Sequence, residues 1–361
     1  MRLVEHSLHA YRLRYERPVT WSDIVEDAAP FVLLRLVSDD GAVGVSEITV
    51  KPTWCGFTPR SLIAAIEDIF IPLLRTLDLS DPMQVRRALD RIPENLAAKA
   101  LIDNACWDLS AARDGRPLWQ QWGGVQHVAL SFAVTRQPPQ AMAREAETMV
   151  DRHGFRTIKV KGGQGLATDI SGIREIRRAV GDAVTLYVDA NGAYPLEQAF
   201  DYATAVADAG VAVLEDPCPL DPDSEFARLR AHCPIPLLVD FGCWYLRDAN
   251  LFVAQGAQAL STKPGRFGLS DCRLMQQGVE QAGGRVVAGL MGESTLGTVA
   301  GLQFAAAVRD PLLPAELTWF HAMTDRITNL QPQIVDGAMA LPDTPSVASL
   351  VDWAAVERLS L

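Results

Sequence analysis

Short apolar runs that end in a charged residue recur along the middle of the chain. Five of them are Thr157–Lys161, Thr185–Asp189, Val211–Glu215, Ile235–Asp240 and Ala259–Lys263. Their last residues follow one another at steps of 23 to 28 positions, and segments with helical periodicity, such as 169–180 and 196–209, lie between them. A repeating strand, loop, helix and loop of this length predicts a β/α barrel with parallel strands.

The rest of the chain supplies the remaining barrel strands and a second unit. Before the repeats, alternating apolar positions and the turn Asp39–Gly41 predict an antiparallel sheet followed by helices. We expect those strands at 2–15, 30–39 and 42–49, and the helices at 59–76, 82–91 and 93–113, the last ending at Gly115. Further barrel strands are expected at 127–135, 285–290 and 315–319. The predicted division is an α+β domain over residues 1–125, a barrel over 126–328, and a segment, 329–361, that contains a turn at Asp336-Gly337 and packs back on the first domain.

The charged residues that end the five runs suggest a metal site. In a β/α barrel the carboxyl ends of the strands meet at one face, so Lys161, Asp189, Glu215, Asp240 and Lys263 would lie together. Three carboxylates placed together are costly to bury unless a cation compensates them. Oxygen ligands without Cys or His suit a hard ion such as Mg²⁺. The alternative is that each charge is an ordinary solvated strand end, but five in register are harder to explain in that way.

Composition narrows the class of protein. The 361 residues are 48% hydrophobic and carry a net charge of −11, which argues against nucleic acid as a partner because no segment concentrates basic residues. No apolar stretch is long enough to span a membrane, and Met1–His6 lacks the apolar core of a signal peptide, so we expect a cytoplasmic protein. The six cysteines contain no Cys-x-x-Cys pair and indicate neither zinc nor disulfides.

Two aromatic loops in the first domain are candidate lids. Trp21 lies in Thr20–Asp23 and Trp54 in Lys51–Phe57, and each aromatic side chain could cover an apolar part of a ligand or simply pack the domain junction. Thr135 and Phe320, at two predicted strand ends, complete the candidate substrate contacts. Gly162–Gly165 is a weak candidate for a phosphate loop, because it matches neither the dinucleotide nor the Walker pattern.

An α+β cap followed by strands ending in Lys-x-Lys, Asp-x-Asn, Glu, Asp and Lys resembles the enolase superfamily. Within it, the chain is most similar to the muconate lactonizing enzyme subgroup of the mandelate racemase/muconate lactonizing enzyme family. Gly44–Glu47 and Gly292–Thr298 also fit, so the resemblance covers essentially the whole chain. It implies an α/β fold: a modified TIM (β/α)7β-type barrel with an N-terminal α+β capping domain.

The resemblance also implies roles for individual residues. Asp189, Glu215 and Asp240 match the Mg²⁺ ligands, and Lys161 and Lys263 match an acid/base pair on opposite faces of the substrate. Further residues implied at or beside the site are Lys159 as a catalytic group, and Asn191 and Glu293 as neighbours that do not bind the metal. One departure is Phe241, which follows Asp240 where similar proteins commonly have Glu. Loss of that carboxylate is expected to favour Lys263 as a base rather than an acid.

The implied chemistry is removal or delivery of the proton α to a carboxylate, with Mg²⁺ stabilising the enediolate. We expect a racemase or epimerase, or a muconate-type cycloisomerase, acting on a small carboxylic acid, and a homo-oligomer. The run 286–291 has no histidine of the mandelate racemase type, and 315–320 has no Asp-x-Asp to hold a substrate amine. A dipeptide epimerase or an acid-sugar dehydratase stays as the alternative within the superfamily, and a non-catalytic Mg²⁺ or carboxylate binder as the alternative outside it.

Overall fold

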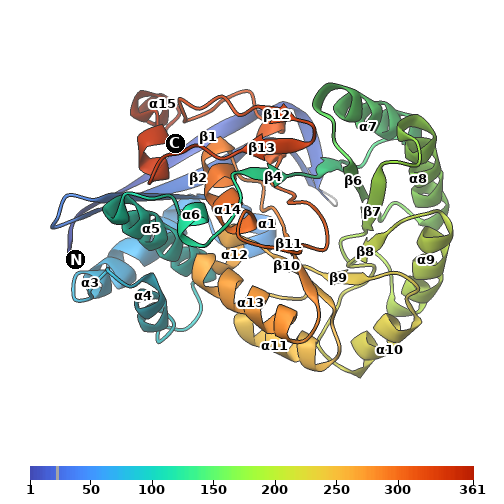
Figure 1. Cartoon of the computed structure of the whole chain (residues 1–361), viewed down its shortest axis with the longest axis horizontal. Helices are drawn as coiled ribbons and strands as arrows, with labels where there is room; N and C mark the ends of the chain where they lie inside the picture. The colour runs from blue at the N-terminus through green and yellow to red at the C-terminus, as the bar shows by residue number, and fades with distance from the viewer. Residues whose placement is uncertain (22–23) are drawn as a thin grey trace.

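An antiparallel sheet and a set of helices form the N-terminal part of the chain. In this computed structural model, which describes all residues except 22–23 and the side chains of Trp21, Ile24 and Thr53, strands β1 (Leu3–Trp21), β2 (Ile24–Ser38) and β3 (Val43–Thr49) pair in that order (Figure 1). The first two strands are longer than predicted. The helical elements are α1 (Pro52–Cys55), α2 (Pro59–Ala65), η1 (Ile66–Phe70), α3 (Ile71–Leu74), α4 (Pro82–Leu89), α5 (Leu96–Asp114) and α6 (Leu118–Gln121).

Close packing of α5 on the sheet explains why residue 44 of β3 is a glycine. A Cβ atom on Gly44 of β3 would lie 2.3 Å from the Ala105 carbonyl oxygen of α5, so only glycine allows this approach. Helix α5 ends where the sequence predicts, at Gly115, whose φ of 65° is the left-handed conformation that glycine adopts easily.

Parallel strands form the curled sheet of the second unit, as predicted, but the sheet has seven strands where the sequence predicts eight. Their order runs from β11 to β5 without interruption, and helices α7 to α10 lie outside the arc (Figure 1). The strands are β5 (Phe132–Val134), β6 (Thr157–Lys161), β7 (Thr185–Asp189), β8 (Val213–Glu215), β9 (Leu237–Val239), β10 (Ala259–Thr262) and β11 (Arg285–Ala288). The helices are α7 (Pro139–His153), α8 (Leu166–Val180), α9 (Leu196–Asp208), α10 (Ser224–His232), α11 (Leu246–Ala254), α12 (Pro264–Phe267), α13 (Leu269–Gln281) and α14 (Thr295–Ala305).

Two predicted barrel strands were wrong in detail. The expected strand 127–135 is divided into two three-residue strands: β4 (His127–Ala129), which pairs outside the barrel, and β5, which belongs to the barrel sheet. The expected strand 315–319 is reduced to a bridge, because the chain turns into the 3-10 helix η2 (Trp319–Ala322). That bridge still closes the ring: Glu316 N donates to Ala288 O of β11 at 2.8 Å, and Ala315 N donates to Ala129 O at 3.0 Å.

The C-terminal segment returns to the N-terminal part of the molecule. Strands β12 (Ile334–Val335) and β13 (Ala338–Ala340) form a hairpin across the predicted Asp336-Gly337 turn, and β13 pairs with β4. The last helical elements are η3 (Val347–Leu350) and α15 (Trp353–Arg358), which lies near β1 in Figure 1. The exact division into three segments stays a prediction. None of the described helices is both long and apolar enough to cross a bilayer.

A buried aspartate ties the C-terminal segment to α5. The Asp108 carboxylate accepts hydrogen bonds from Val45 N at 2.8 Å, Ser346 Oγ at 2.6 Å and Val347 N at 2.9 Å. Burial raises the pKa of Asp108 to about 6 although these hydrogen bonds act to lower it. Folding therefore disfavours ionisation of Asp108 relative to the unfolded chain.

Substitution of Asp108 by asparagine is expected to remove a pH-dependent part of the stability. Because the folded-state pKa lies above the unfolded one, the contribution of Asp108 is full below about pH 4 and is lost as the pH rises through about 6. The free energy of unfolding of the wild type relative to Asp108→Asn should thus fall by roughly 3 kcal/mol over this range. Urea unfolding at pH 4, 5.5 and 7 measures it; a pH-independent difference would contradict the assignment.

Candidate active site

The charged residues that end the central strands meet at one mouth of the barrel, as the sequence predicts. Lys161 pairs in register with Asp189, and Asp189 with Glu215, on adjoining strands β6, β7 and β8. Asp240 follows β9 and Lys263 follows β10 directly. All are buried except Lys161, whose side chain is 15% exposed.

Lys159 is the most buried of the three lysines and contacts three carboxylates. Its Nζ atom is 2.7 Å from Glu215 Oε2, 2.9 Å from Glu316 Oε1 and 3.1 Å from Asp189 Oδ2. Burial lowers the pKa of Lys159, but the three carboxylates outweigh burial and hold the pKa well above its usual range. This amine keeps its proton, so it is suited to balancing negative charge rather than to accepting a proton.

Lys161 lies two residues further along β6, on the same side of the strand and closer to solvent. Its Nζ atom is 2.5 Å from Asp189 Oδ2 and 3.3 Å from Asn191 Oδ1. Asn191 holds Asp189 from the other direction, with its backbone N donating to Oδ1 at 2.8 Å and its Nδ2 to Oδ2 at 3.0 Å. Asn191 has a φ of 51°, a left-handed conformation that asparagine tolerates better than most residues.

Lys263 directly follows β10, whereas Lys161 ends β6, and the Lys263 Nζ atom lies 2.5 Å from Asp240 Oδ2. Arg266 of α12 binds the same aspartate, with Nη1 3.1 Å from Oδ1 and 2.8 Å from the backbone oxygen. Burial raises the pKa of Asp240, but Lys263 and Arg266 lower it more, to about 2. Phe241 is 45% exposed and packs edge-on against Trp244, at 5.3 Å between ring centroids. Its effect on Lys263 stays a prediction.

Sequence reasoning missed three residues that hold this cluster together. Glu316 is buried and accepts from Tyr187 Oη at 2.8 Å as well as from Lys159. Asp216, at a φ of 38°, accepts from the backbone N atoms of Asp240 at 3.0 Å and Phe241 at 2.6 Å. Arg266 is the third. The sequence shows only that Asp216 and Arg266 lie close to strand ends and that Glu316 lies in the predicted last strand. It does not show which side chain each of them binds.

The carboxylates fit a divalent ion in their chemistry. Across the residues that the structure describes, no three acidic, His or Cys side chains enclose a metal site, since ammonium groups lie against the carboxylates. Glu215 Oε2 is buried, and its 2.7 Å ion pair with Lys159 Nζ does not have hydrogen-bond geometry. Burial and the neighbouring Asp189 raise the pKa of Glu215 well above its usual range. Asp189, Glu215 and Asp240 thus form an oxygen-only set that a hard cation would stabilise.

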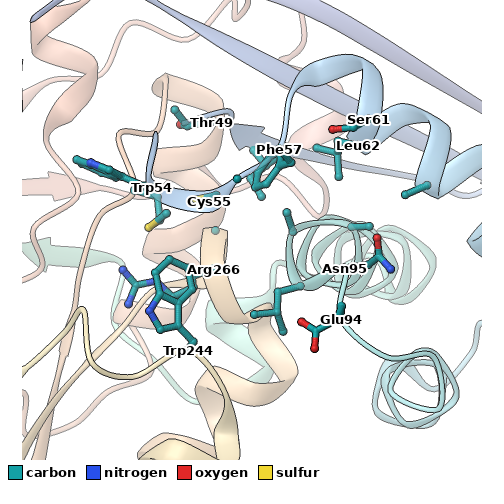
Figure 2. Close-up of a pocket in the computed structure, with 18 of the residues that line it drawn as sticks. Thr49, Trp54, Cys55, Phe57, Ser61, Leu62, Glu94, Asn95, Trp244 and Arg266 are labelled. Carbon is teal, nitrogen blue, oxygen red and sulfur yellow. The ribbon is translucent and has the colours of Figure 1, made fainter. Parts of the chain in front are cut away.

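The structure places three of the four other predicted substrate contacts. Trp54 is half-buried on α1 and lines a cavity with Arg266, whereas the Trp21 side chain lies outside the described residues (Figure 2). Thr135 is buried just after β5, with Oγ1 3.3 Å from Arg17 Nη2, and Phe320 of η2 stacks on His321 at 4.5 Å. Their contact with a substrate stays a prediction.

Glu293 is buried on the loop after β11, where both carboxylate oxygens accept from Met291 N. Burial raises its pKa to about 7. A second buried glutamate, Glu47 of β3, accepts from Ser294 Oγ at 2.6 Å and Tyr11 Oη at 2.5 Å. These contacts fix the loop after β11 against the N-terminal sheet. Two short motifs of the sequence, Gly44–Glu47 and Gly292–Thr298, thus supply the residues that join this loop to the sheet.

The glycine-rich loop after β6 is not arranged to bind phosphate. Gly163 N and Gln164 N both donate to the carboxylate of Asp169, at 2.6 and 3.0 Å. Tyr194 and Tyr202 hydroxyls donate to the same carboxylate at 2.6 and 2.9 Å. An internal anion therefore satisfies the amides that a phosphate would need.

Comparisons with known proteins match both parts of the chain. The family model for the mandelate racemase / muconate lactonizing enzyme N-terminal domain matches residues 7–123, and the enolase C-terminal domain-like model matches 141–348. L-Ala-D/L-Glu epimerase of Bacillus subtilis (strain 168) is 29% identical over 78% of this chain and 79% of its own. The o-succinylbenzoate synthase of Geobacillus stearothermophilus is 27% identical over 97% and 94%. The structure of muconate lactonizing enzyme from Mucobacterium Smegmatis complexed with muconolactone has a TM-score of 0.95 at 27% identity, covering 100% of both chains.

Proposed function

The chain belongs to the mandelate racemase/muconate lactonizing enzyme family of the enolase superfamily, and from this premise we propose that it moves the proton α to the carboxylate of a small organic acid. Members of the superfamily generally use a divalent metal, typically Mg²⁺. The similar proteins include an epimerase, a synthase and cycloisomerases, so similarity alone does not determine the reaction.

The arrangement of two amines around three carboxylates carries the proposal. Lys161 on β6 and Lys263 after β10 approach the cluster from different strands. Such an arrangement lets one amine remove a proton from one face of a bound acid and the other deliver a proton to the opposite face. A racemase or epimerase needs both transfers, whereas a cycloisomerase needs one and uses the second amine for its charge.

The residues divide the work according to their surroundings. Asp189, Glu215 and Asp240 would hold Mg²⁺, which when bound supplies positive charge opposite the substrate carboxylate. Lys159 keeps its proton between Glu215 and Glu316 and balances their charge. Lys161, nearer solvent, accepts or returns the α-proton at Nζ, and Lys263 does the same on the other side. Burial of the cluster excludes water, which strengthens these electrostatic interactions.

The substrate we favour lacks an α-ammonium group. Residues 315–320 contain one carboxylate, Glu316, and it is already bound to Lys159 and Tyr187. No acidic pair is therefore available there to hold an amine. A dipeptide epimerase is kept as the second candidate because the Bacillus subtilis relative is an L-Ala-D/L-Glu epimerase. Assembly into a homo-oligomer is also expected.

Solvent deuterium exchange tests the proposal. A panel of 2-hydroxy and 2-alkyl carboxylic acids is incubated with the protein and MgCl₂ in D₂O, and label at the α-carbon is followed by NMR and mass spectrometry. We expect incorporation that depends on both protein and Mg²⁺. Binding of Mg²⁺ without exchange of any acid would instead support a non-catalytic carboxylate-binding barrel.

A further inference from the structure

Two side chains outside the carboxylate cluster hold the loop after β6, which begins directly after the proposed base. Asp169, in the first turn of α8, accepts hydrogen bonds from Gly163 N at 2.6 Å and Gln164 N at 3.0 Å. Arg136, shortly after β5, donates through Nε to Gly162 O at 2.6 Å. The peptide group that joins Gly162 to Gly163 is thus held from both sides, by an arginine at its oxygen and by an aspartate at its nitrogen.

The same two side chains also reach the segment that follows β7. Arg136 Nη2 lies 3.4 Å from Ala190 O, and Tyr194 Oη donates to Asp169 Oδ2 at 2.6 Å. Tyr202 of α9 donates to the same oxygen at 2.9 Å. Burial and the Asp169 carboxylate raise the pKa of each tyrosine above its usual range, so both hydroxyls keep the protons that they donate. The loops after β6 and β7 are therefore joined through one buried aspartate and one arginine.

The loop after β6 is closely packed between these two side chains. A Cβ atom on Gly162 would lie 2.6 Å from Tyr202 Oη and 2.8 Å from Asp169 Oδ2. A Cβ atom on Gly163 would lie 2.5 Å from Arg136 Nη2. Packing of this density allows the loop little displacement while both side chains are in place.

The loop bears on one of the two proposed proton-transfer amines. Lys161 ends β6, and the next backbone N atom donates to Asp189 O at 2.9 Å, which holds these two strand ends side by side. Lys263 has a different support, because Asn104 of α5 donates through Nδ2 to Pro264 O at 2.9 Å. A change at the loop after β6 should therefore act on the first amine and spare the second.

We propose that Asp169 and Arg136, together called the loop clamp, are positioning residues for proton transfer at Lys161. The inference rests on the proposed function and adds to it two residues that act through the backbone of the loop. A general base must lie within hydrogen-bond reach of the proton that it removes, and a displacement of about 1 Å can lower the rate by about 10²-fold.

Asp169→Asn loosens the clamp with little change in side-chain volume. In either orientation, the asparagine amide leaves Gly163 N or Gln164 N facing an NH₂ group, so a hydrogen bond to the loop is lost. Hydrogen exchange followed by mass spectrometry should show faster exchange of the peptide that contains these two amides. The same exchange as in the wild type would contradict the role of Asp169 in holding the loop.

Separate rates for two enantiomers show whether the loss acts through Lys161. Exchange of the α-proton in D₂O is measured with Mg²⁺ for each enantiomer of mandelate and of 2-phenylpropionate. The enantiomer that depends on Lys161 is the one that Lys161→Arg no longer exchanges. For Asp169→Asn we expect kcat for this enantiomer to fall by about 10²-fold, with KM changed less than about twofold and the opposite enantiomer slowed less than about threefold.

Two further variants complete the test. Arg136 is half-buried, and Arg136→Met removes its donors while keeping the length of the side chain. It should give the same selective loss, and it replaces Asp169→Asn if that variant does not fold. Glu175→Gln is the matched control, because it removes one carboxylate from the same helix where Glu175 pairs with the exposed Arg178. Both enantiomers should exchange at the wild-type rate in this control.

The outcomes separate the inference from the function on which it rests. An equal fall for both enantiomers, or no fall in either clamp variant, would overturn the inference and leave the proposed function intact. Where the wild type exchanges a single enantiomer, an unchanged kcat in both clamp variants overturns the inference in the same way. Failure of the wild type to exchange either acid would contradict both.

Discussion

Replacement of Lys161 by alanine is expected to reduce α-proton exchange by about 10²–10⁴-fold, the usual contribution of a positioned general base. The protein should stay folded, because the side chain is partly exposed and Asp189 keeps its contacts with Lys159 and Asn191. Exchange in D₂O measures the loss, and thermal unfolding checks the fold. Exchange at the wild-type rate would refute the assignment of Lys161.

Lys161→Arg is the matched control for charge. Arginine keeps the positive charge beside Asp189 but does not give up its proton in proteins, so it cannot act as a base. We expect the arginine variant to be as inactive as the alanine variant. If arginine restored exchange, Lys161 would contribute charge alone.

Lys263→Ala then distinguishes the reactions: a racemase should lose interconversion of enantiomers, whereas a one-base enzyme should keep exchange at reduced rate.

Mg²⁺ is expected to stabilise the wild type and not Glu215→Gln. Glutamine keeps the shape of the side chain and removes one of three clustered negative charges, which weakens cation binding. For the wild type, Mg²⁺ at a hundred times its dissociation constant should add about 2.7 kcal/mol to the free energy of unfolding. Calorimetry of EDTA-treated protein titrated with MgCl₂ measures the shift, and exchange activity should be lost in parallel.

Glu293→Gln is the matched control for the metal experiment. Glu293 is also buried near the mouth, but its carboxylate accepts from Met291 N and is not among the three proposed ligands. Its glutamine variant should keep the Mg²⁺-dependent shift in melting temperature. The same shift in Glu215→Gln, or its loss in Glu293→Gln alone, would contradict the proposed ligand set.

The sequence predicted the features that local pattern determines. Strands β6 and β7 end where an apolar run meets Lys161 and Asp189, because a buried strand requires apolar side chains up to the point where it reaches the barrel mouth. The predicted hairpin turn at Asp336-Gly337 and the helix end at Gly115 depend on positive φ, which the residue types disclose. Because neighbouring barrel strands are parallel, their carboxyl ends, and the charged residues on them, lie at the same mouth of the barrel.

Features that depend on contacts across the ring could not be predicted. Glu316 reaches Lys159 over 157 residues of chain, and the sequence of the last barrel segment does not disclose that pairing. The same holds for Arg266 on Asp240, and for Asp169 in the glycine-rich loop. Closure of the barrel by a bridge instead of a strand depends on where η2 begins, which apolar periodicity over 315–319 does not reveal.

A crystal structure with Mn²⁺ in place of Mg²⁺ tests the central claim most directly, because anomalous scattering locates the ion independently of its coordination. We predict one peak within about 2.5 Å of carboxylate oxygens from Asp189, Glu215 and Asp240, with Lys161 and Lys263 released from their ion pairs and placed on opposite sides of it. Carboxylates that keep their ammonium partners at saturating Mn²⁺, with the ion bound elsewhere or absent, would contradict the account.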